Sequence, residues 1–445
     1  MIKKCITQIL TRLKSKGRYK HFSVLKNYEY KTRHECKNLQ KKLLFNMLKY
    51  SIKNIPYYRN IAKESKIVPS KRTVIEDLKK FPILTKQILR EEYKNLKSER
   101  VHTNFIKNTS GGSTGEPVLF LQDVSMKETG IASQILFDEW AGRKVGEKMI
   151  KLWGCEKELL EGTQGFDGFI NKNLLNITLL NSFRMTKKDM LNFTKTINRE
   201  KPKMIEAYVQ SIYELAKFIK ENKLKIFSPN GVITSAGTLY PEVKKFIEEV
   251  FNCPVFNRYG SREVGSIACS CEKGYGLHLN IFNHYIEILD NDLKPCKPGK
   301  IGKVYVTTLH NFVMPLIRYD IGDMAVAAKI EQCSCGRGLP LIEKVVGRTV
   351  NLFKTKTSEL IDGEYFTHLF YFKGWVKKFQ ITQKDYNLIQ ILVVLQNEKN
   401  QEDIQEIEHN IKIVMGKNCK IVWKFVNNIK STKSGKYLYT ISEVK

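Results

Sequence analysis

Hydrophobic and polar residues change their spacing along this chain, and the changes predict where helices and strands lie. Apolar residues recur every three or four positions over residues 35–53, which predicts an amphipathic helix that ends at Pro56. Further helices are predicted over residues 124–141 and 241–251, and an apolar run at Val255–Asn257 predicts a strand. Because strands alternate with helices in this part of the chain, we expect a layered α/β architecture.

The pattern changes near Arg348. Beyond it, short apolar runs predict strands at residues 379–382, 388–395 and 421–426, and residues 401–414 have the spacing of a helix. This stretch of about 95 residues is long enough to form a small α+β domain of its own. The two predicted domains are residues 1–347 and residues 348–445.

Length and composition limit the class of protein. The chain has 445 residues and a hydrophobic content of 42%, which suits a soluble globular protein of two or three domains. The longest apolar run, Leu388–Leu395, is too short to span a membrane, and residues 1–20 lack the continuous apolar core of a signal peptide. We therefore expect a cytoplasmic protein whose ten cysteines are thiols or metal ligands rather than disulfides.

The formal net charge of +30 has two explanations. It favours anionic partners such as CoA, an acidic glycan, anionic lipid or nucleic acid. An AT-rich genome, which inflates Lys, Asn and Ile, explains most of the excess without any partner. Residues 1–20 place apolar residues at helical spacing opposite lysines and arginines, so they form either a terminal helix packed on the protein or a basic leader at the inner face of the membrane.

A short loop rich in glycine and hydroxyl side chains carries the first candidate chemistry. Its residues are Thr109, Ser110, Gly111, Gly112, Ser113, Thr114 and Gly115. Glycines let backbone N–H groups approach an anion closely, and the hydroxyls add donors for phosphate oxygens. The loop lacks the GK[ST] ending of a Walker A loop, and closely flanking apolar segments argue against a flexible linker. It is therefore a candidate phosphate-binding loop.

Four further stretches follow this loop in an order that resembles the adenylate-forming ligases. They are Ser235-Ala236-Gly237-Thr238, Asn257–Glu263, Ile317–Asp323 and Ser434-Gly435-Lys436. They resemble the adenine-side turn, the YGxxE element, the RYxxGD element and the C-terminal SGK of that superfamily. The chain is most similar to the phenylacetate–CoA ligase-like branch, which includes ligases of capsular polysaccharide biosynthesis, and the resemblance covers roughly residues 30–445.

The resemblance implies a fold and a reaction. The fold is a large N-terminal adenylate-forming domain followed by a small, mobile C-terminal domain. The reaction is ATP-dependent, Mg²⁺-assisted activation of a carboxylate to an acyl adenylate with release of pyrophosphate, and then acyl transfer to CoA or to an amine or sugar acceptor. The carboxylic acid and the acceptor stay open.

The resemblance also implies roles for particular residues. The loop cradles the β- and γ-phosphates, Glu263 holds Mg²⁺, and Lys436 approaches the reacting carboxylate and α-phosphate as a catalytic cation. Asp323 accepts hydrogen bonds from the ribose hydroxyls. The strand predicted at Val255–Asn257 is expected to lead into a turn over Tyr259–Glu263. The remaining nucleotide contacts implied are Ser235, Ala236, Gly237, Tyr259, Gly260 and Arg348. Val350 and Asn351 replace the acidic pair that follows this arginine in the family, so no hinge residue is assigned.

A second group of residues is independent of ATP. Two Cys-x-Cys pairs, Cys269–Cys271 and Cys333–Cys335, lie on either side of His278. Thiolate and imidazole ligands suit Zn²⁺, and three cysteines with one histidine close a structural site. The spacing to His278 favours Cys271 over Cys269, so the predicted zinc ligands are Cys271, His278, Cys333 and Cys335. Reduced, buried cysteines without metal are the alternative.

One function outside catalysis competes with the ligase. The charge, the Cys/His group and tyrosine-containing basic segments are also compatible with a zinc-stabilised, nucleic-acid-binding protein. The chain has no RRM, KH or zinc-finger pattern, so we expect no specific nucleic acid.

Overall fold

The computed structural model describes residues 16–100, 104–109, 118–153, 176–182, 185–348, 352–357, 359–370, 373–429 and 439–444. The chain divides into two compact units. Among the described residues, the larger unit runs to Lys344 apart from Gly322–Met324. The smaller unit contains those three residues together with the described chain from Val345 onward. The functions assigned above to residues 1–347 and 348–445 stay predictions.

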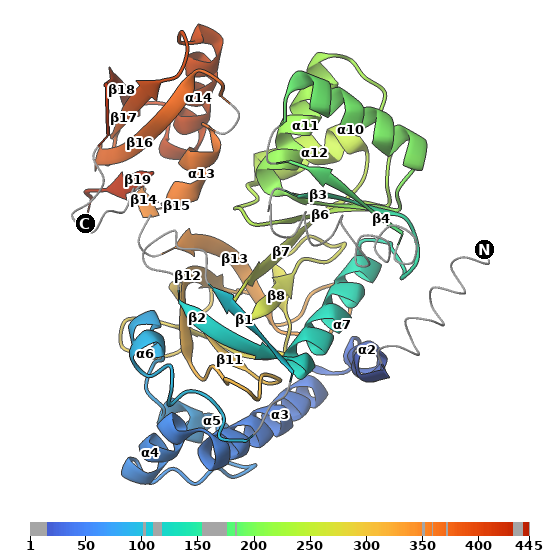
Figure 1. The fold of residues 1–445 in the computed structure, drawn as a ribbon, viewed down its shortest axis with the longest axis vertical. Coiled ribbons are helices and arrows are strands. Elements are labelled where there is room, and N and C mark those ends of the chain that lie inside the picture. Colours follow the sequence, from blue (N-terminus) through green and yellow to red (C-terminus); the bar gives the residue numbers. More distant parts are fainter. Residues whose placement is uncertain are drawn as a thin grey trace. The chain divides into compact units, whose positions relative to one another are not determined.

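Five helices open the described chain (Figure 1). They are α2 (Lys16–Tyr28), α3 (Arg33–Asn54), α4 (Pro56–Glu64), α5 (Val74–Lys79) and α6 (Lys86–Glu91). Thr32 begins α3 with a capping box, because its hydroxyl accepts a hydrogen bond from the Glu35 N–H while the Glu35 carboxylate accepts one from Thr32. The helix predicted over residues 35–53 is thus present, but Pro56 also begins α4, where its missing N–H costs nothing.

Much of the basic leader predicted for residues 1–20 lies outside the described residues, and its described end enters α2. None of the helices that the structure describes is long and apolar enough to cross a membrane.

An 11-stranded sheet, most of whose residues belong to the larger unit, has the strand order β10-β11-β12-β13-β9-β8-β7-β6-β5-β3-β4. The strands on the parallel side are β3 (Met149–Trp153), β4 (Ile177–Asn181), β5 (Met204–Tyr208), β6 (Gly231–Ser235) and β7 (Val255–Ser261). The other strands are β8 (Gly265–Cys269), β9 (Leu277–Leu279), β10 (His284–Leu289), β11 (Ile301–Thr308), β12 (Tyr319–Ala327) and β13 (Leu341–Arg348).

Helices cover the parallel strands (Figure 1). They are α10 (Lys187–Glu200), α11 (Val209–Glu221) and α12 (Pro241–Phe251), while α7 (Val124–Trp140) packs against β8 and β2. Buried side chains such as Ile205, Val232, Leu215 and Ile247 form one core between the sheet and α10–α12. Parallel strands buried on both faces need nearly continuous apolar sequence, which explains why these strands are rich in apolar residues.

A two-stranded hairpin precedes α7. Its strands are β1 (Phe105–Thr109) and β2 (Leu119–Asp123), and Thr109 pairs with Leu119 at the end where the connecting loop begins and ends. The Asp123 carboxylate caps α7 by accepting a hydrogen bond from the Met126 N–H. The hairpin therefore fixes both chain ends of the candidate phosphate loop, whose residues 110–115 lie outside the described part of the chain.

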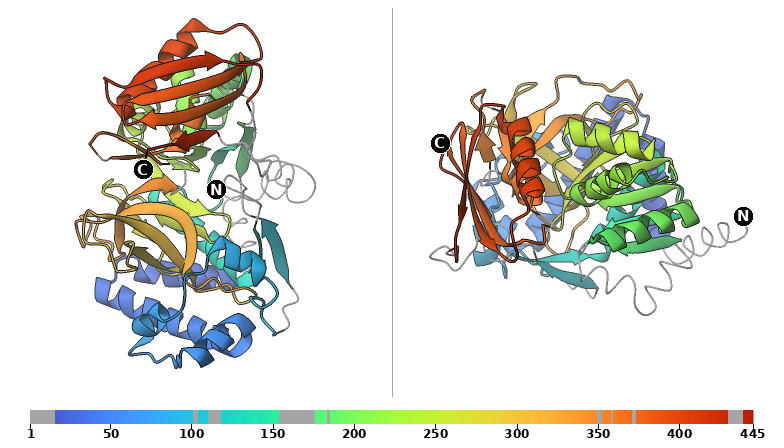
Figure 2. Two further views of the ribbon diagram at one scale, coloured as in Figure 1. Left: turned by 90° about the vertical axis from the view of Figure 1, so that its left-hand side faces the viewer. Right: turned by 90° about the horizontal axis from the view of Figure 1, so that it is seen from above.

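The smaller unit is built on a four-stranded sheet in the order β18-β17-β16-β19. Its elements are β14 (Leu352–Lys354), β15 (Leu360–Asp362), α13 (Gly363–His368), β16 (Val376–Asp385), β17 (Leu388–Leu395), α14 (Gln401–Met415), β18 (Lys420–Phe425) and β19 (Thr440–Ser442). Figure 2 shows α14 along one face of this sheet. The three strands and the helix predicted beyond Arg348 are all present, in an α+β arrangement.

Candidate nucleotide site and cysteine–histidine cluster

Two of the predicted nucleotide segments lie at the same edge of the sheet. Ser235 ends β6, and Ala236 follows with a left-handed φ of 55°. Because Thr234 pairs with Asn257 on the neighbouring strand, the end of β6 at Ser235 lies beside the part of β7 that carries Tyr259. Loops at the carboxyl ends of parallel strands form the ligand-binding crevices of open α/β sheets, so this edge is suited to a nucleotide.

The turn expected over Tyr259–Glu263 begins later than predicted. Strand β7 continues to Ser261 and pairs with β8, with a bulge between Tyr259 and Gly260. A Cβ at Gly260 would lie 2.5 Å from the Gly265 carbonyl oxygen, so only glycine lets the two strands approach this closely. The sequence pattern missed this because the pairing depends on β8, which comes after the motif.

Glu263 is held close to the flank of the phosphate loop. Its side chain is buried, with 6% exposed. Gln122 on β2 donates hydrogen bonds from Nε2 to the carbonyl oxygens of Arg262 (2.8 Å) and Glu263 (3.2 Å). The strand that leaves the phosphate loop is thus tied to the segment that carries the proposed Mg²⁺ ligand. No local pattern in the sequence marks Gln122, since its partner Arg262 lies 140 positions away.

A buried ion pair supports this edge from inside the sheet. Arg258 on β7 pairs with Glu206 on β5, and both side chains are 7% exposed. Burial alone would raise the pKa of Glu206, but the charges of Arg258 and Lys151 outweigh it and hold the pKa at about 2. The pair fixes the strand immediately before Tyr259.

Asp323 lies half-buried on β12. The start of that strand is fixed by Arg318, which adopts a left-handed φ of 52°. Its Nε donates to the Glu287 carboxylate at 3.1 Å, and its Nη1 donates to the Phe81 carbonyl oxygen at 2.9 Å. Leu84 pairs with Tyr319 beside it, so the chain before α6 is attached to the strand that carries Asp323.

Several predicted site residues cannot be placed. Ser110, Gly111, Gly112, Ser113, Thr114, Gly115 and Lys436 lie outside the described residues. Arg348 ends β13, but its side chain lies outside the description as well. Their roles stay predictions.

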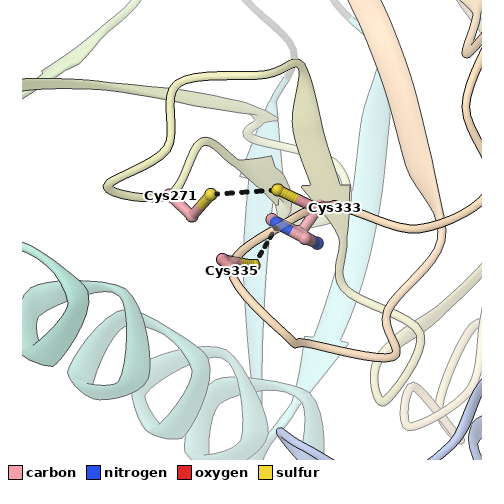
Figure 3. Close-up of side chains that lie close together, drawn as sticks. Cys271, Cys333 and Cys335 are labelled. Carbon is pink, nitrogen blue, oxygen red and sulfur yellow. Dashed lines mark hydrogen bonds between the residues drawn. The ribbon is translucent and has the colours of Figure 1, made fainter.

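The four predicted zinc ligands come together from three places in the chain. Cys271 follows β8, His278 lies on β9, and the loop between β12 and β13 carries Cys333 and Cys335. Their ligand atoms all lie within 4.8 Å of one another. Cys271 Sγ is 3.6 Å from Cys333 Sγ, and Cys335 Sγ is 3.4 Å from His278 Nε2. Figure 3 shows the three cysteines converging, and we call the four residues the cysteine–histidine cluster.

The electrostatics of the cluster suit a bound cation. Burial raises the pKa of the Cys271 thiol to about 12 and lowers the pKa of His278 to about 4. The imidazole is therefore neutral at physiological pH, as a metal ligand must be, while the thiol needs a cation to lose its proton. Three cysteines and one histidine at this spacing fit Zn²⁺, and each cysteine that the structure describes is free of disulfides.

The sequence of this chain is similar to one protein family and to several curated proteins. Residues 353–443 match the CapK C-terminal domain family. The chain is 24% identical to Protein CapK of Staphylococcus aureus over 94% of its length and 92% of that protein. It is 25% identical to a phenylacetate–coenzyme A ligase of Thermus thermophilus over 74% of its length and 76% of that enzyme.

A solved structure has the same fold. It is a 2-hydroxyisobutyryl-CoA ligase in its postadenylation state, with a TM-score of 0.67 and 17% identity, and the match covers 94% of this chain and 91% of that one. The predicted α/β fold with a small C-terminal domain is thus confirmed. The relatives named as phenylacetate–coenzyme A ligases agree with the predicted class, an AMP-forming acid ligase. By sequence the chain is similar to CapK and to the phenylacetate–CoA ligases, the proteins to which its motifs point, and by fold it is similar to the 2-hydroxyisobutyryl-CoA ligase.

Proposed function

We propose that this protein activates a carboxylic acid with ATP and then transfers the acyl group to CoA or another acceptor. The observation that supports it most is the meeting of the Ser235–Gly237 and Tyr259–Gly260 segments at one edge of the sheet, with buried Glu263 tied to the phosphate-loop hairpin. The names of the relatives agree with it, because they include CoA ligases and a ligase in complex with an acyl adenylate.

The proposed chemistry has two steps. A carboxylate oxygen of the acid attacks the α-phosphorus of ATP, the bond to the β-phosphate breaks, and pyrophosphate leaves. The acceptor then attacks the acyl carbonyl, and AMP leaves with the bonding electrons. In the first step Glu263 would hold Mg²⁺, which neutralises charge on the phosphates, while Asp323 and Tyr259 orient the nucleoside and Lys436 stabilises the developing charge.

The acceptor is proposed from the names of the relatives and from the chemistry of acyl transfer. CoA is favoured by the named relatives, whereas an amine or sugar would suit a role in capsular or other surface polysaccharide biosynthesis. A cytoplasmic location, with peripheral contact between residues 1–20 and the inner membrane face, is part of the same proposal.

Carboxylate-dependent exchange of pyrophosphate into ATP tests the first step. A panel of carboxylic acids should give Mg²⁺-dependent exchange with at least one member. Glu263→Gln and Asp323→Asn should lower the exchange rate by about 10²-fold or more, the size typical of a lost transition-state contact. Asp292→Asn, which changes an exposed carboxylate in a turn, is the matched control and should leave the rate unchanged. Wild-type rates in both site variants would contradict the proposed roles.

We also propose structural zinc in the cysteine–histidine cluster. Purified protein should contain about one zinc per chain, and a chelator should lower its melting temperature because metal binding is coupled to folding. Cys333→Ser should lower the zinc content, while Cys269→Ser, a buried cysteine outside the cluster, should keep it. Metal-free protein with unchanged stability would refute the site.

A further inference from the structure

The loop that carries two cluster cysteines also packs against the N-terminal helices. Arg33, at the start of α3, donates from Nη1 to the Glu331 carbonyl oxygen at 2.8 Å. A Cβ at Gly338 would lie 1.9 Å from the Lys31 carbonyl oxygen, so the loop and the turn between α2 and α3 touch backbone to backbone. We call residues 29–32 the α2–α3 turn.

Arg337 reaches from this loop into the α2–α3 turn. Its side chain is 5% exposed, and its Nε donates to Glu29 Oε1 at 3.0 Å. The guanidinium also lies over the Trp140 ring at 4.4 Å and the Tyr30 ring at 5.3 Å. Glu29 is 1% exposed, so its charge is stabilised only by the groups that face it.

Those groups come from three parts of the chain. Trp140 on α7 donates from Nε1 to Glu29 Oε1 at 2.7 Å, and Lys26 on α2 donates to Oε2 at 2.7 Å. Of the three residues Arg337, Trp140 and Lys26, only Arg337 lies in the loop that carries Cys333 and Cys335. Removing one partner of a buried ion pair typically costs several kcal/mol, so the position of Arg337 matters for the docking of α2.

Arg337 is also coupled to the cluster itself. It lies two positions after Cys335, and its Nη1 donates hydrogen bonds of 3.0 and 2.8 Å to the carboxylate of Glu272, which directly follows Cys271. When zinc binds, three thiolates and one Zn²⁺ carry one net negative charge, which a neighbouring guanidinium neutralises. Without metal, the ligand bonds to Cys333 and Cys335 are absent, so the backbone that carries Arg337 is less constrained beside Glu29.

We propose that occupancy of the cysteine–histidine cluster controls the docking of helix α2, with Arg337 as the link. Zinc binding orders the Cys333–Gly338 loop and directs Arg337 toward Glu29, and loss of zinc loosens α2 from α7 and from the loop. This inference rests on the zinc site proposed above, and it assigns that site an effect on a helix which contributes no ligand.

Helix α2 has a second anchor that is independent of the cluster. Arg18 makes two hydrogen bonds, each of 3.0 Å, from Nε and Nη2 to the Glu128 carboxylate on α7. This contact lies at the other end of α2, so it provides a matched control: its loss should loosen the helix without altering the dependence on metal.

Hydrogen–deuterium exchange of the full chain tests the proposal, because it reports the local opening of α2 directly. Zinc-loaded protein is compared with protein treated with a chelator under reducing conditions, and zinc content is measured in each sample. Zinc removal should speed exchange in residues 16–33 by at least about fivefold, the lower end of typical coupling between sites. Exchange in α14, in the smaller unit, should not change.

Variants of Arg337 and Arg18 distinguish the role of Arg337 from that of zinc binding itself. Arg337→Gln should retain zinc but show fast hydrogen–deuterium exchange in α2 whether or not zinc is bound. If Arg337→Gln does not fold, Glu29→Gln replaces it, and the same result is expected. Arg18→Gln should speed exchange in α2 yet keep its response to zinc.

The outcomes are distinct. Zinc-loaded wild type whose α2 exchange does not respond to the chelator would overturn the link while leaving the zinc site standing. A preserved zinc response in both Arg337→Gln and Glu29→Gln would overturn the role of Arg337. Wild-type protein that binds no zinc would overturn both this inference and the zinc site, but not the ligase activity.

Discussion

Replacing Gly260 by alanine tests whether the β7–β8 bulge positions the candidate site. The added Cβ would lie 2.5 Å from the Gly265 carbonyl oxygen and 3.1 Å from both Gly265 C and Ser266 Cα, all of them backbone atoms. The oxygen contact is about 0.9 Å shorter than ordinary van der Waals contact, which begins at 3.4 Å. Because no flexible side chain can move aside, the two strands must separate, and we expect a cost of about 1–3 kcal/mol.

The same substitution in a helix provides the control. A Cβ at Gly130, inside α7, meets nothing within 4 Å. Gly130→Ala should therefore raise stability by about 0.5–1 kcal/mol, since alanine loses less backbone entropy than glycine in a helix. The two variants differ in the space around the new methyl group, so their opposite effects isolate the steric term.

Two measurements decide the outcome. Thermal unfolding should show a lower melting temperature for Gly260→Ala and a higher one for Gly130→Ala. Pyrophosphate exchange should fall by at least about tenfold in Gly260→Ala at a temperature where the protein is folded, because displacement of about 1 Å in a positioned site is costly. If Gly260→Ala kept both its melting temperature and its exchange rate, the close approach of the two strands would be wrong.

Three further predictions concern other parts of the chain. Lys436→Ala should cripple adenylate formation but spare transfer from a pre-formed acyl adenylate, and equal loss of both half-reactions would exclude a role confined to the first step. Burial lowers the pKa of His284 from 6.5 to about 4, so the unfolded chain binds the proton more tightly than the folded chain does. The free energy of unfolding should therefore fall by on the order of 3 kcal/mol as the pH drops from 6.5 toward 4, and His284→Asn should flatten this part of the profile of stability against pH. Glu206→Ala should destabilise by about 3–5 kcal/mol because it strands a buried charge, whereas combining Glu206→Leu with Arg258→Met should recover much of that loss.

Helices were predictable from sequence where their signals are local. The helix expected over residues 401–414 is α14, Gln401–Met415, and its cap is Asn400, whose side chain accepts from Glu402 and Asp403 just inside the helix. Capping and amphipathic spacing both lie within a few residues, so neither depends on the rest of the fold. Strand β7 was predicted too short, because its last residues pair with β8 across a bulge that no local pattern encodes.

The candidate sites also contain some features that local sequence predicts and others that depend on distant segments. The types of residue that bind phosphate or zinc are visible in the sequence, and for the cysteine–histidine cluster even the choice of Cys271 over Cys269 followed from spacing. The groups that position them are not visible, because they come from distant segments: Gln122 is 140 positions from the carbonyl it holds, and Arg337 is 308 positions from Glu29. A glutamine in a strand or an arginine after a cysteine pair has no signature of its own, so only the topology that brings the segments together gives it a role. Sequence motifs therefore predict the chemistry available to this chain, while the contacts that position these groups become visible only in the folded structure.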